Sequence, residues 1–396
     1  MSFGRTHIGS GPGSLLAACL LTACAGTATQ PAAAASLQSE SHAIDVPREP
    51  VRALAQRRVV ARGLRNPRGM QIVEDGLLVA EAGTGDPANA ATGRLIKLVD
   101  TNADGDYLDE GEQRVLLDGQ PSKNILDVVR RDEVFGMAGM DRGVVNDEPM
   151  VMAALAFFGG PSTLFAVHGD RVEPWGKTHG NINDVAFDAS RGKWYGASST
   201  TDEVVELLPG NGSQRVLKLP TLASGQDAVP GYLRFDPITN DLLVSQFSGS
   251  PEGEEGGDGT ELVPRAASIV RVSPERKTAT PFITGLTVPT DLEVDAQGAV
   301  LVLEFCDSFL DPVGTREALA KTGHGGFRRF SGRLLRIDRG TGAVRILAEG
   351  LDAPTNIAAA PGGFLVAEGM GTPGRIIPGP SGDLPLEGFI ELVTYP

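Results

Sequence analysis

The chain has 396 residues, of which 35 are Lys or Arg and 50 are Asp or Glu, so its formal net charge is −15. Because nucleic acids and anionic lipid surfaces attract concentrated positive charge, this balance argues against both as electrostatic partners. The length allows one large domain or two ordinary ones, and the 51 glycines predict many tight turns between short strands.

Residues 1–23 have the pattern of a secretion signal. Arg5 supplies a positive charge, "SLLAACLL" supplies a short apolar core, and "LTAC", which ends at Cys24, is similar to a bacterial lipobox. We therefore expect cleavage before Cys24, lipidation of its thiol and anchoring in the bacterial cell envelope. Ala25 favours the outer membrane, on its periplasmic or surface side. An ordinary signal peptide that is cleaved nearby is the alternative.

Residues 24–56 are small, polar and Pro-containing, which predicts a flexible tether to a domain that spans residues 57–396. Processing would remove Cys19 and lipidation would occupy Cys24, so Cys306 would remain alone and no intrachain disulfide could form. Beyond the signal, the sequence has no apolar run of the ~20 residues that a bilayer span requires.

The rest of the chain repeats one plan. Three examples are "VVARGLRNPRGMQIVEDGLLVAEAG", "FITGLTVPTDLEVDAQGAVLVLEFC" and "ILAEGLDAPTNIAAAPGGFLVAEGM". Each has a strand that ends in Gly-Leu, a turn, and two alternating strands joined by a hairpin, and a further strand follows. Units of about four short strands with a period of ~40–50 residues predict an all-β, six-bladed β-propeller of four-stranded antiparallel blades. The predicted blade starts lie near Asn66, Asn124, Ile182, Pro230, Pro289 and Pro354.

The acidic stretch "DTNADGDYLDEGE", residues 100–112, lies between the strands "GRLIKLV" and "QRVLLDG", which predicts a hairpin loop without flanking helices. Its first half matches a calcium-binding loop, with oxygen ligands at alternate positions and Gly105 for the sharp turn. The second half differs, because Gly111 stands where such loops carry a bidentate Glu. Crowded carboxylates repel one another unless a cation neutralises them, so we predict a structural Ca²⁺ site, with a solvated acidic turn as the alternative. The predicted ligands are Asp100, Asn102, Asp104, Asp106, Asp109 and Glu112.

Alignment of the repeats predicts which side chains meet at the mouth of the central channel. At the start of the innermost strands these are Gly69, Asp127, Asp184, Tyr232, Asp291 and Asn356. At the ends of the second strands they are Glu81, Ser198, Gln246, Glu304 and Glu368. Such crowding raises carboxylate pKa values or recruits a cation. We predict catalytic roles for Asp184, Asp291, Asn356 and Glu304, and ligand contacts for Asp127 and Tyr232. Hydrogen bonding between blades is the alternative, above all for the Glu and Gln set.

Long loop insertions are predicted on the same, top face, where binding loops on rigid scaffolds usually lie. They are "GTGDPANAAT", "SPEGEEGGDGTELVP" and "CDSFLDPVGTREALAKTGHGGFRRFSG". In the last, His324 has glycine neighbours that allow a ligand to approach, which makes it a candidate general base or cofactor contact. Arg328 is a candidate contact for an anionic ligand, or a partner of the acidic insertion in the fourth blade. Cys306 is expected to be a buried thiol.

The repeated pattern "GLxxPtxlxvdxxGxlxVxE" resembles the NHL-type and related six-bladed propellers over about residues 57 to 396. These include the scytonemin-cluster propellers, the gluconolactonases and the quinone-dependent sugar dehydrogenases. "GLRNPRG" together with "DTNADGD" is similar to stretches of the sugar dehydrogenases, a resemblance that implies calcium and pyrroloquinoline quinone (PQQ) as cofactors. The gluconolactonase resemblance implies a channel metal, for which Asp291 and Asn356 have suitable side chains, although the opening Glu-Gly-Pro stretch of that family is absent.

Taken together, the sequence predicts a monomeric, lipid-anchored, calcium-stabilised propeller that binds a small-molecule or carbohydrate-like ligand in its central channel. A metal-dependent hydrolase or lactonase, a PQQ-dependent sugar dehydrogenase and a protein-interaction scaffold are the alternatives. The sequence contains no G-x-S-x-G, H-E-x-x-H or GxxxxGK[ST] motif, so it offers no known signature for acyl-serine, zinc-protease or nucleotide chemistry.

Overall fold

The computed structural model describes residues 43–125, 132–157, 160–246, 263–308 and 327–394. All regular elements in these ranges are β-strands, which confirms the predicted all-β class. In the same ranges there is no helix of the length and apolarity needed to cross a membrane. Residues 42–396 form one compact unit.

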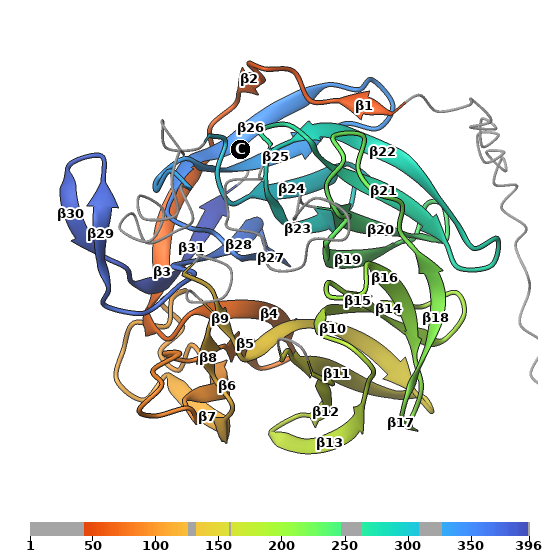
Figure 1. Ribbon diagram of the computed structural model, residues 1–396. Coiled ribbons are helices and arrows are strands. Elements are labelled where there is room, and N and C mark those ends of the chain that lie inside the picture. Colours follow the sequence, from red (N-terminus) through yellow and green to blue (C-terminus); the bar gives the residue numbers. More distant parts are fainter. Residues whose placement is uncertain (1–42, 126–131, 158–159, 247–262, 309–326, 395–396) are drawn as a thin grey trace, which may run out of the picture. The chain divides into compact units, whose positions relative to one another are not determined.

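Six sheets, each with four antiparallel strands at its centre, are arranged in a ring (Figure 1). From the inside outward, blade one contains β4 (Pro67–Val73), β5 (Gly76–Glu81), β6 (Gly93–Leu98) and β7 (Gln113–Gln120). Blade two contains β10 (Met137–Val145), β11 (Glu148–Leu155), β12 (Thr163–His168) and β13 (Arg171–Lys177). Blade three contains β14 (Ile182–Asp188), β15 (Lys193–Ser198), β16 (Glu203–Leu207) and β18 (Ser213–Lys218). Blade four contains β19 (Pro230–Asp236), β20 (Asp241–Gln246), β21 (Ala267–Ser273) and β22 (Thr278–Leu286). Blade five contains β23 (Pro289–Val294), β24 (Val300–Glu304), β25 (Gly332–Ile337) and β26 (Val344–Leu351). Blade six contains β27 (Asn356–Ala360), β28 (Gly363–Glu368), β31 (Gly388–Thr394) and β3 (Gln56–Leu64). The fold is the predicted six-bladed β-propeller.

The N-terminal strands close the ring and lengthen two blades. β3 pairs with β31, so the last blade combines strands from both ends of the domain. β1 (Ile44–Asp45) adds to β22 in parallel, and β2 (Val51–Arg52) adds to β26 in the same way. A third short strand, β17 (Gly210–Asn211), extends blade two beside β13. The ordered domain therefore begins by Ile44 and includes part of the predicted tether, rather than starting at residue 57.

The second blade does not begin where the repeat predicts. Lys123–Asn124 forms β8, which pairs only with β9 (Val134–Phe135) in a separate two-stranded ladder. The innermost strand of blade two is β10, which starts at Met137 and pairs with β11. The predicted start near Asn124 is therefore wrong by about one short hairpin.

The core lies between the blades, because each sheet buries both of its faces. On β5, Leu77 and Val79 pack towards blade six, whereas Leu78 and Ala80 pack towards blade two. Similar clusters fill the other blade-to-blade contacts. Burying one Val, Leu or Ile side chain stabilises a fold by about 1.5–3 kcal/mol, so strands that are apolar at both alternating positions favour this stacked architecture.

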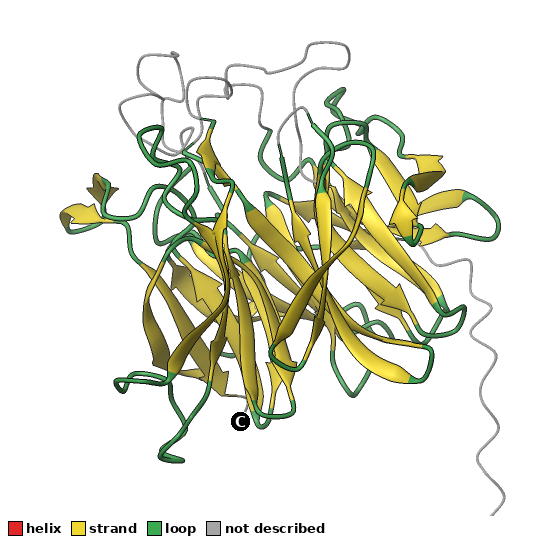
Figure 2. Ribbon diagram, turned by 90° about the horizontal axis from the view of Figure 1, so that it is seen from below, coloured by secondary structure: helices red, strands yellow, loops and turns green. Residues whose placement is uncertain are grey.

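The two ends of the strands define two faces (Figure 2). The β6–β7 loop with the acidic stretch emerges on the same face as the hairpins between first and second strands, which we call the bottom face. The connections between second and third strands emerge on the opposite, top face. The last of these carries the hairpin β29 (Ile376–Gly379) and β30 (Gly382–Pro385). Most of two predicted top-face insertions, residues 250–264 and 306–332, lies outside the described residues.

Candidate functional site

The strand register places five predicted channel residues at one equivalent position of the innermost strands. These are Gly69, Asp184, Tyr232, Asp291 and Asn356. In blade two this position belongs to Gly139, and the predicted Asp127 lies outside the described residues. Gly139 is required there, because a Cβ atom would collide with the Asp184 carboxylate.

An arginine that the repeat alignment did not single out connects these residues. Arg234, on β19, donates from Nη1 to Asp184 Oδ2 at 2.7 Å and from Nη2 to Asp291 Oδ2 at 3.3 Å. Its Nε atom lies 3.7 Å from Glu293 Oε2. Asn356 Nδ2 donates to Asp291 Oδ2 at 2.6 Å. The structure thus brings together Asp184, Asp291 and Asn356 around one buried guanidinium that links four blades.

The aspartates of this cluster also join each blade to the next. Asp184 accepts a hydrogen bond from Leu233 N at 3.0 Å, and Asp291 accepts one from Ile357 N at 2.8 Å. Asp141 does the same for Phe187 N at 2.8 Å. These N–H groups lie on the inner edge of a sheet, where no further strand can pair with them. The carboxylates therefore have a structural task, whatever else they do.

Four carboxylates share the Arg234 charge, since Asp141 also interacts electrostatically with it. Burial raises the pKa of Asp184 and of Asp291 to about 7, against the opposing attraction of Arg234. Burial raises the pKa of Glu293 to about 7 in the same way. One guanidinium is too little positive charge for four ionised groups, so the cluster holds protons near neutral pH. The pKa values of these carboxyl groups suit general acids and bases, but Asp184 and Asp291 are fully buried.

Sequence reasoning missed Arg234, Glu293 and Asp141, although a signal was present. Each lies on an innermost strand two residues after the position that the repeat alignment compared. Side chains two apart on a strand face the same side, so the same alignment extended by one step would have found them.

At the same level of the innermost strands, Arg68 of blade one meets Tyr232 of blade four. Arg68 donates from Nη1 to Val134 O at 3.2 Å and lies 3.4 Å from Glu133 Oε1. Burial raises the pKa of Tyr232 to about 12, although its hydrogen bond with Arg68 acts in the other direction. Both side chains are buried, so this contact also fills part of the channel interior with protein side chains.

Glu304 belongs to a motif that recurs at the ends of second strands. Its Oε1 accepts a hydrogen bond from Thr287 N at 2.6 Å, and its Oε2 accepts one from Arg333 Nε at 2.5 Å. Glu81 has the same arrangement with Arg65 N and Arg94. In the last blade, Glu368 Oε2 accepts a hydrogen bond from Asp352 N at 2.5 Å, and Glu368 Oε1 lies 3.7 Å from Arg57 Nη2. Because both oxygens of Glu304 are engaged, the geometry favours a structural over a catalytic role.

A Glu304→Gln substitution tests this role. Gln keeps an acceptor for Thr287 N but removes the charge that faces the buried Arg333, so we expect a loss of about 2 kcal/mol in the free energy of unfolding. The matched control is Glu387→Gln at an exposed position, which should change the same quantity by less than about 0.5 kcal/mol. Urea unfolding measures both. An unchanged Glu304→Gln stability would show that the motif does not support the blade.

The acidic loop between β6 and β7 is folded by hydrogen bonds from its own backbone, as predicted without flanking helices. Asp100 accepts bonds from Asp104 N and Gly105 N at 3.2 and 2.8 Å. Glu112, which is fully buried, accepts bonds from Thr101 N and Asp109 N at 2.9 and 3.1 Å. These contacts hold the loop in a single compact turn, with Gly105 in the left-handed region at φ 89°.

Within this loop the predicted ligands converge only in part. Asn102 Nδ2 lies 3.0 Å from Asp104 Oδ2 and 2.5 Å from Asp109 Oδ2, so two carboxylates face one amide. Asp106 instead turns towards Arg58, at 3.2 Å. In the described part of the chain, no group of three or more His, Cys, Asp and Glu side chains is arranged to hold a metal ion. The donor chemistry of carboxylate and amide oxygens nevertheless suits a hard cation such as Ca²⁺.

The remaining predicted residues divide into described and undescribed ones. Arg328 is exposed, whereas its neighbour Arg329 is buried and binds Asp352 through two hydrogen bonds of 2.8 and 2.5 Å. Cys306 is a buried free thiol whose pKa burial raises well above its ordinary value. It is therefore not an activated nucleophile. The predicted base His324 and lipidation site Cys24 lie outside the described residues.

No family model matches the sequence, and no curated protein is significantly similar to it. Solved structures are similar in fold. A protein of unknown function from Bacteroides thetaiotaomicron is 12% identical, with 88% of this chain and 75% of that chain covered and a TM-score of 0.50. A putative oxidoreductase (glucose dehydrogenase) from Thermus thermophilus is 16% identical (85% and 99% covered, TM-score 0.48). The PQQ-bound aldose sugar dehydrogenase of Streptomyces coelicolor is 15% identical (85% and 98%, TM-score 0.37). At 12% identity, the likeness to the first of these structures shows a shared fold alone.

Proposed function

We propose that this chain is a lipid-anchored, extracytoplasmic β-propeller that binds calcium through its 100–112 loop and a small-molecule or carbohydrate-like ligand at the mouth of its channel. The observation that carries the calcium proposal is the convergence of Asp104 and Asp109 on Asn102, inside a loop ordered by Asp100 and Glu112. The negative charges of Asp100 and Glu112 also add to burial in raising the pKa of Tyr107. A cation would relieve this repulsion.

The loop also contacts the seam where the ring closes. Tyr107 N donates to Val60 O at 2.7 Å, and Arg58 donates from Nη2 to Gly105 O at 2.8 Å. Val60 and Arg58 belong to β3, the N-terminal strand that completes blade six. Ordering of the loop by calcium would therefore support the contact between the first and last blades. This gives the proposed ion a structural role at the seam.

Calcium is expected to stabilise the folded chain and to protect β3. A ligand at 100 times its Kd raises the free energy of unfolding by about 2.7 kcal/mol, and Asp104→Ala should abolish this gain. The control Asp383→Ala, which removes an exposed carboxylate from the β29–β30 hairpin, should keep it. Thermal unfolding with calcium or chelator measures the gain. Deuterium uptake should fall over Gln56–Leu64 on calcium addition, whereas β19 should not change.

The proposal would fail if calcium leaves the unfolding temperature and the deuterium uptake of β3 unchanged in the wild type. It would also fail if Asp104→Ala and Asp383→Ala respond to calcium alike, since the effect would then come from general charge screening.

The proposed ligand site lies at the mouth because Arg68 and Arg234 cross the interior. The same observation weighs against a hydrolase with a channel metal, since Asp184 and Asp291 are already paired with Arg234. A PQQ-dependent oxidoreductase rests on the sequence resemblance alone. Membrane anchoring rests on the lipobox-like "LTAC" that ends at Cys24.

A further inference from the structure

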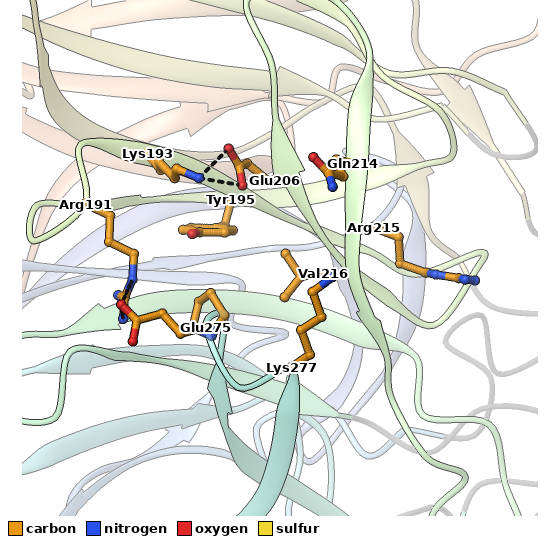
Figure 3. A pocket seen from close by; sticks show the side chains of 10 residues that line it. Arg191, Lys193, Tyr195, Glu206, Gln214, Arg215, Val216, Glu275 and Lys277 are labelled. Carbon is orange, nitrogen blue, oxygen red and sulfur yellow. Dashed lines mark hydrogen bonds and ion pairs between the residues drawn. The ribbon is translucent and has the colours of Figure 1, made fainter.

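A small pocket opens on the bottom face where blades three and four meet (Figure 3). Its volume is about 150 Å³. The blade-three wall comes from β15, β16 and β18 and from the turn before β15, and the blade-four wall comes from the turn between β21 and β22. The pocket is far along the chain from the acidic loop and shares no residue with the Arg234 cluster.

The charged residues around this pocket carry a positive excess on an otherwise acidic chain. Four are basic and two are acidic, which leaves two positive charges: Arg191, Lys193, Arg215, Lys277, Glu206 and Glu275. Both carboxylates already have partners, since Lys193 Nζ lies 2.9 Å from Glu206 and Arg191 Nη2 lies 3.2 Å from Glu275. Lys277 has no ion-pair or hydrogen-bond partner among the described residues, and its backbone occupies a left-handed turn position at φ 53°.

Tyr195 supplies an unpaired donor to the same pocket. Its side chain is 1% exposed, and among the described residues its hydroxyl has no hydrogen-bond partner. Figure 3 shows Tyr195 among Arg191, Lys193 and Glu275. Burial, followed by the charge of Glu206, raises its pKa to about 12, so the hydroxyl stays protonated at neutral pH. Because Tyr195 lines the pocket and its hydroxyl has no protein partner among the described residues, the hydroxyl is available to water or a ligand there.

We propose that this pocket binds a small oxyanion, a phosphate or carboxylate group, with the Tyr195 hydroxyl and the Lys277 ammonium as its donors. The Arg191–Glu275 and Lys193–Glu206 pairs form the walls, and the two cations offset the negative charge of the two carboxylates. One water needs about 10–15 Å³ of such cavity volume, so 150 Å³ is enough room for a phosphate or a short carboxylate. This site is independent of the proposed calcium and channel-mouth sites.

The test is a calorimetric titration of the whole protein with inorganic phosphate, acetate and, as a neutral probe, glucose. We expect saturable one-to-one binding of phosphate or acetate, with a Kd of roughly millimolar order. Any binding of glucose should be the same in the wild type and in the variants described below. Lys277→Ala should weaken oxyanion binding about tenfold, because it removes a charge-assisted hydrogen bond. Tyr195→Phe, which keeps the ring in the core, should also weaken it.

The matched control is Lys123→Ala. It removes one exposed lysine charge from a distant strand, so it alters the net charge by the same amount as Lys277→Ala and should leave binding within about twofold. Lys277 is exposed, so its variant folds even if Tyr195→Phe is unstable. The proposal is overturned if neither anion shows saturable binding, or if Lys277→Ala and Lys123→Ala bind equally well. Binding of glucose that is lost in Lys277→Ala would overturn it as well.

Discussion

Replacement of Arg234 by Met should lower the free energy of unfolding by about 3–5 kcal/mol at pH 8. Loss of one partner from a buried ion pair leaves the other charge without compensation, which costs about this much. Here Asp184, Asp291 and Glu293 lose the guanidinium that they share. Met fills a similar volume, so the loss reflects charge more than packing. Urea unfolding at fixed pH measures it.

The penalty should depend on pH in a direction that identifies its cause. As the pH falls below about 7 the carboxylates of the folded chain take up protons, so the missing arginine leaves less uncompensated charge. We expect the Arg234→Met penalty to shrink as the pH falls from 8 towards 5. Arg345→Met, at an exposed position on β26, is the control and should stay within about 0.5 kcal/mol of the wild type. A penalty below 1 kcal/mol at pH 8, or one of equal size at both pH values, would contradict the ion-pair interpretation.

Replacement of Asp184 by Asn should raise the free energy of unfolding at neutral pH relative to the wild type. In acid this advantage over the wild type should be smaller. The pKa of Asp184 in the fold is about 7, compared with an ordinary value of 3.8. The folded state therefore keeps a proton that the unfolded chain releases, and wild-type stability is lost as the pH rises from about 4 to about 7. Asn does not titrate and still offers an oxygen to Leu233 N. The gap corresponds to about 4 kcal/mol at most.

The expected result is an advantage of Asp184→Asn over the wild type that grows from pH 4 to pH 7 and is constant above pH 7. Asp338→Asn provides a control of opposite sign, because hydrogen bonds from Thr341 lower the pKa of Asp338. Its stabilisation is present above the unfolded pKa and is lost as the pH falls, so Asp338→Asn should fall behind the wild type only towards neutral pH. A pH-independent difference between Asp184→Asn and the wild type would mean that Asp184 is ionised throughout.

The propeller could be predicted from the sequence because its signals are local. Short apolar strands such as Gly76–Glu81 and the Gly-Leu turns recur within each unit, and recognising them requires no knowledge of distant contacts. The acidic loop was placed for the same reason, since its flanking strands are adjacent in sequence. Blade two was misplaced because "KNILDVVRRDEVFG" resembles a blade entry, whereas β8 pairs only with β9.

The Arg234 cluster could not be predicted in the same way, because it depends on ring closure. Asp184 and Asp291 are 50 and 57 residues from Arg234 in the sequence, and only the arrangement of the blades brings them together. The repeat identified the aspartates but not the cation that pairs with them. Without that cation, the carboxylates suggested a channel metal. With Arg234 included, the carboxylates form a buried hydrogen-bond and ion-pair network that connects neighbouring blades.

The proposed calcium site is tested most directly by native mass spectrometry of the folded chain in millimolar calcium, with wild type and Asp104→Ala measured side by side. The structure leads us to expect one calcium ion per wild-type chain and none in Asp104→Ala, with Asp383→Ala retaining its ion. A wild type without calcium would contradict the proposed site, and an Asp104→Ala chain that keeps one ion would place the calcium elsewhere.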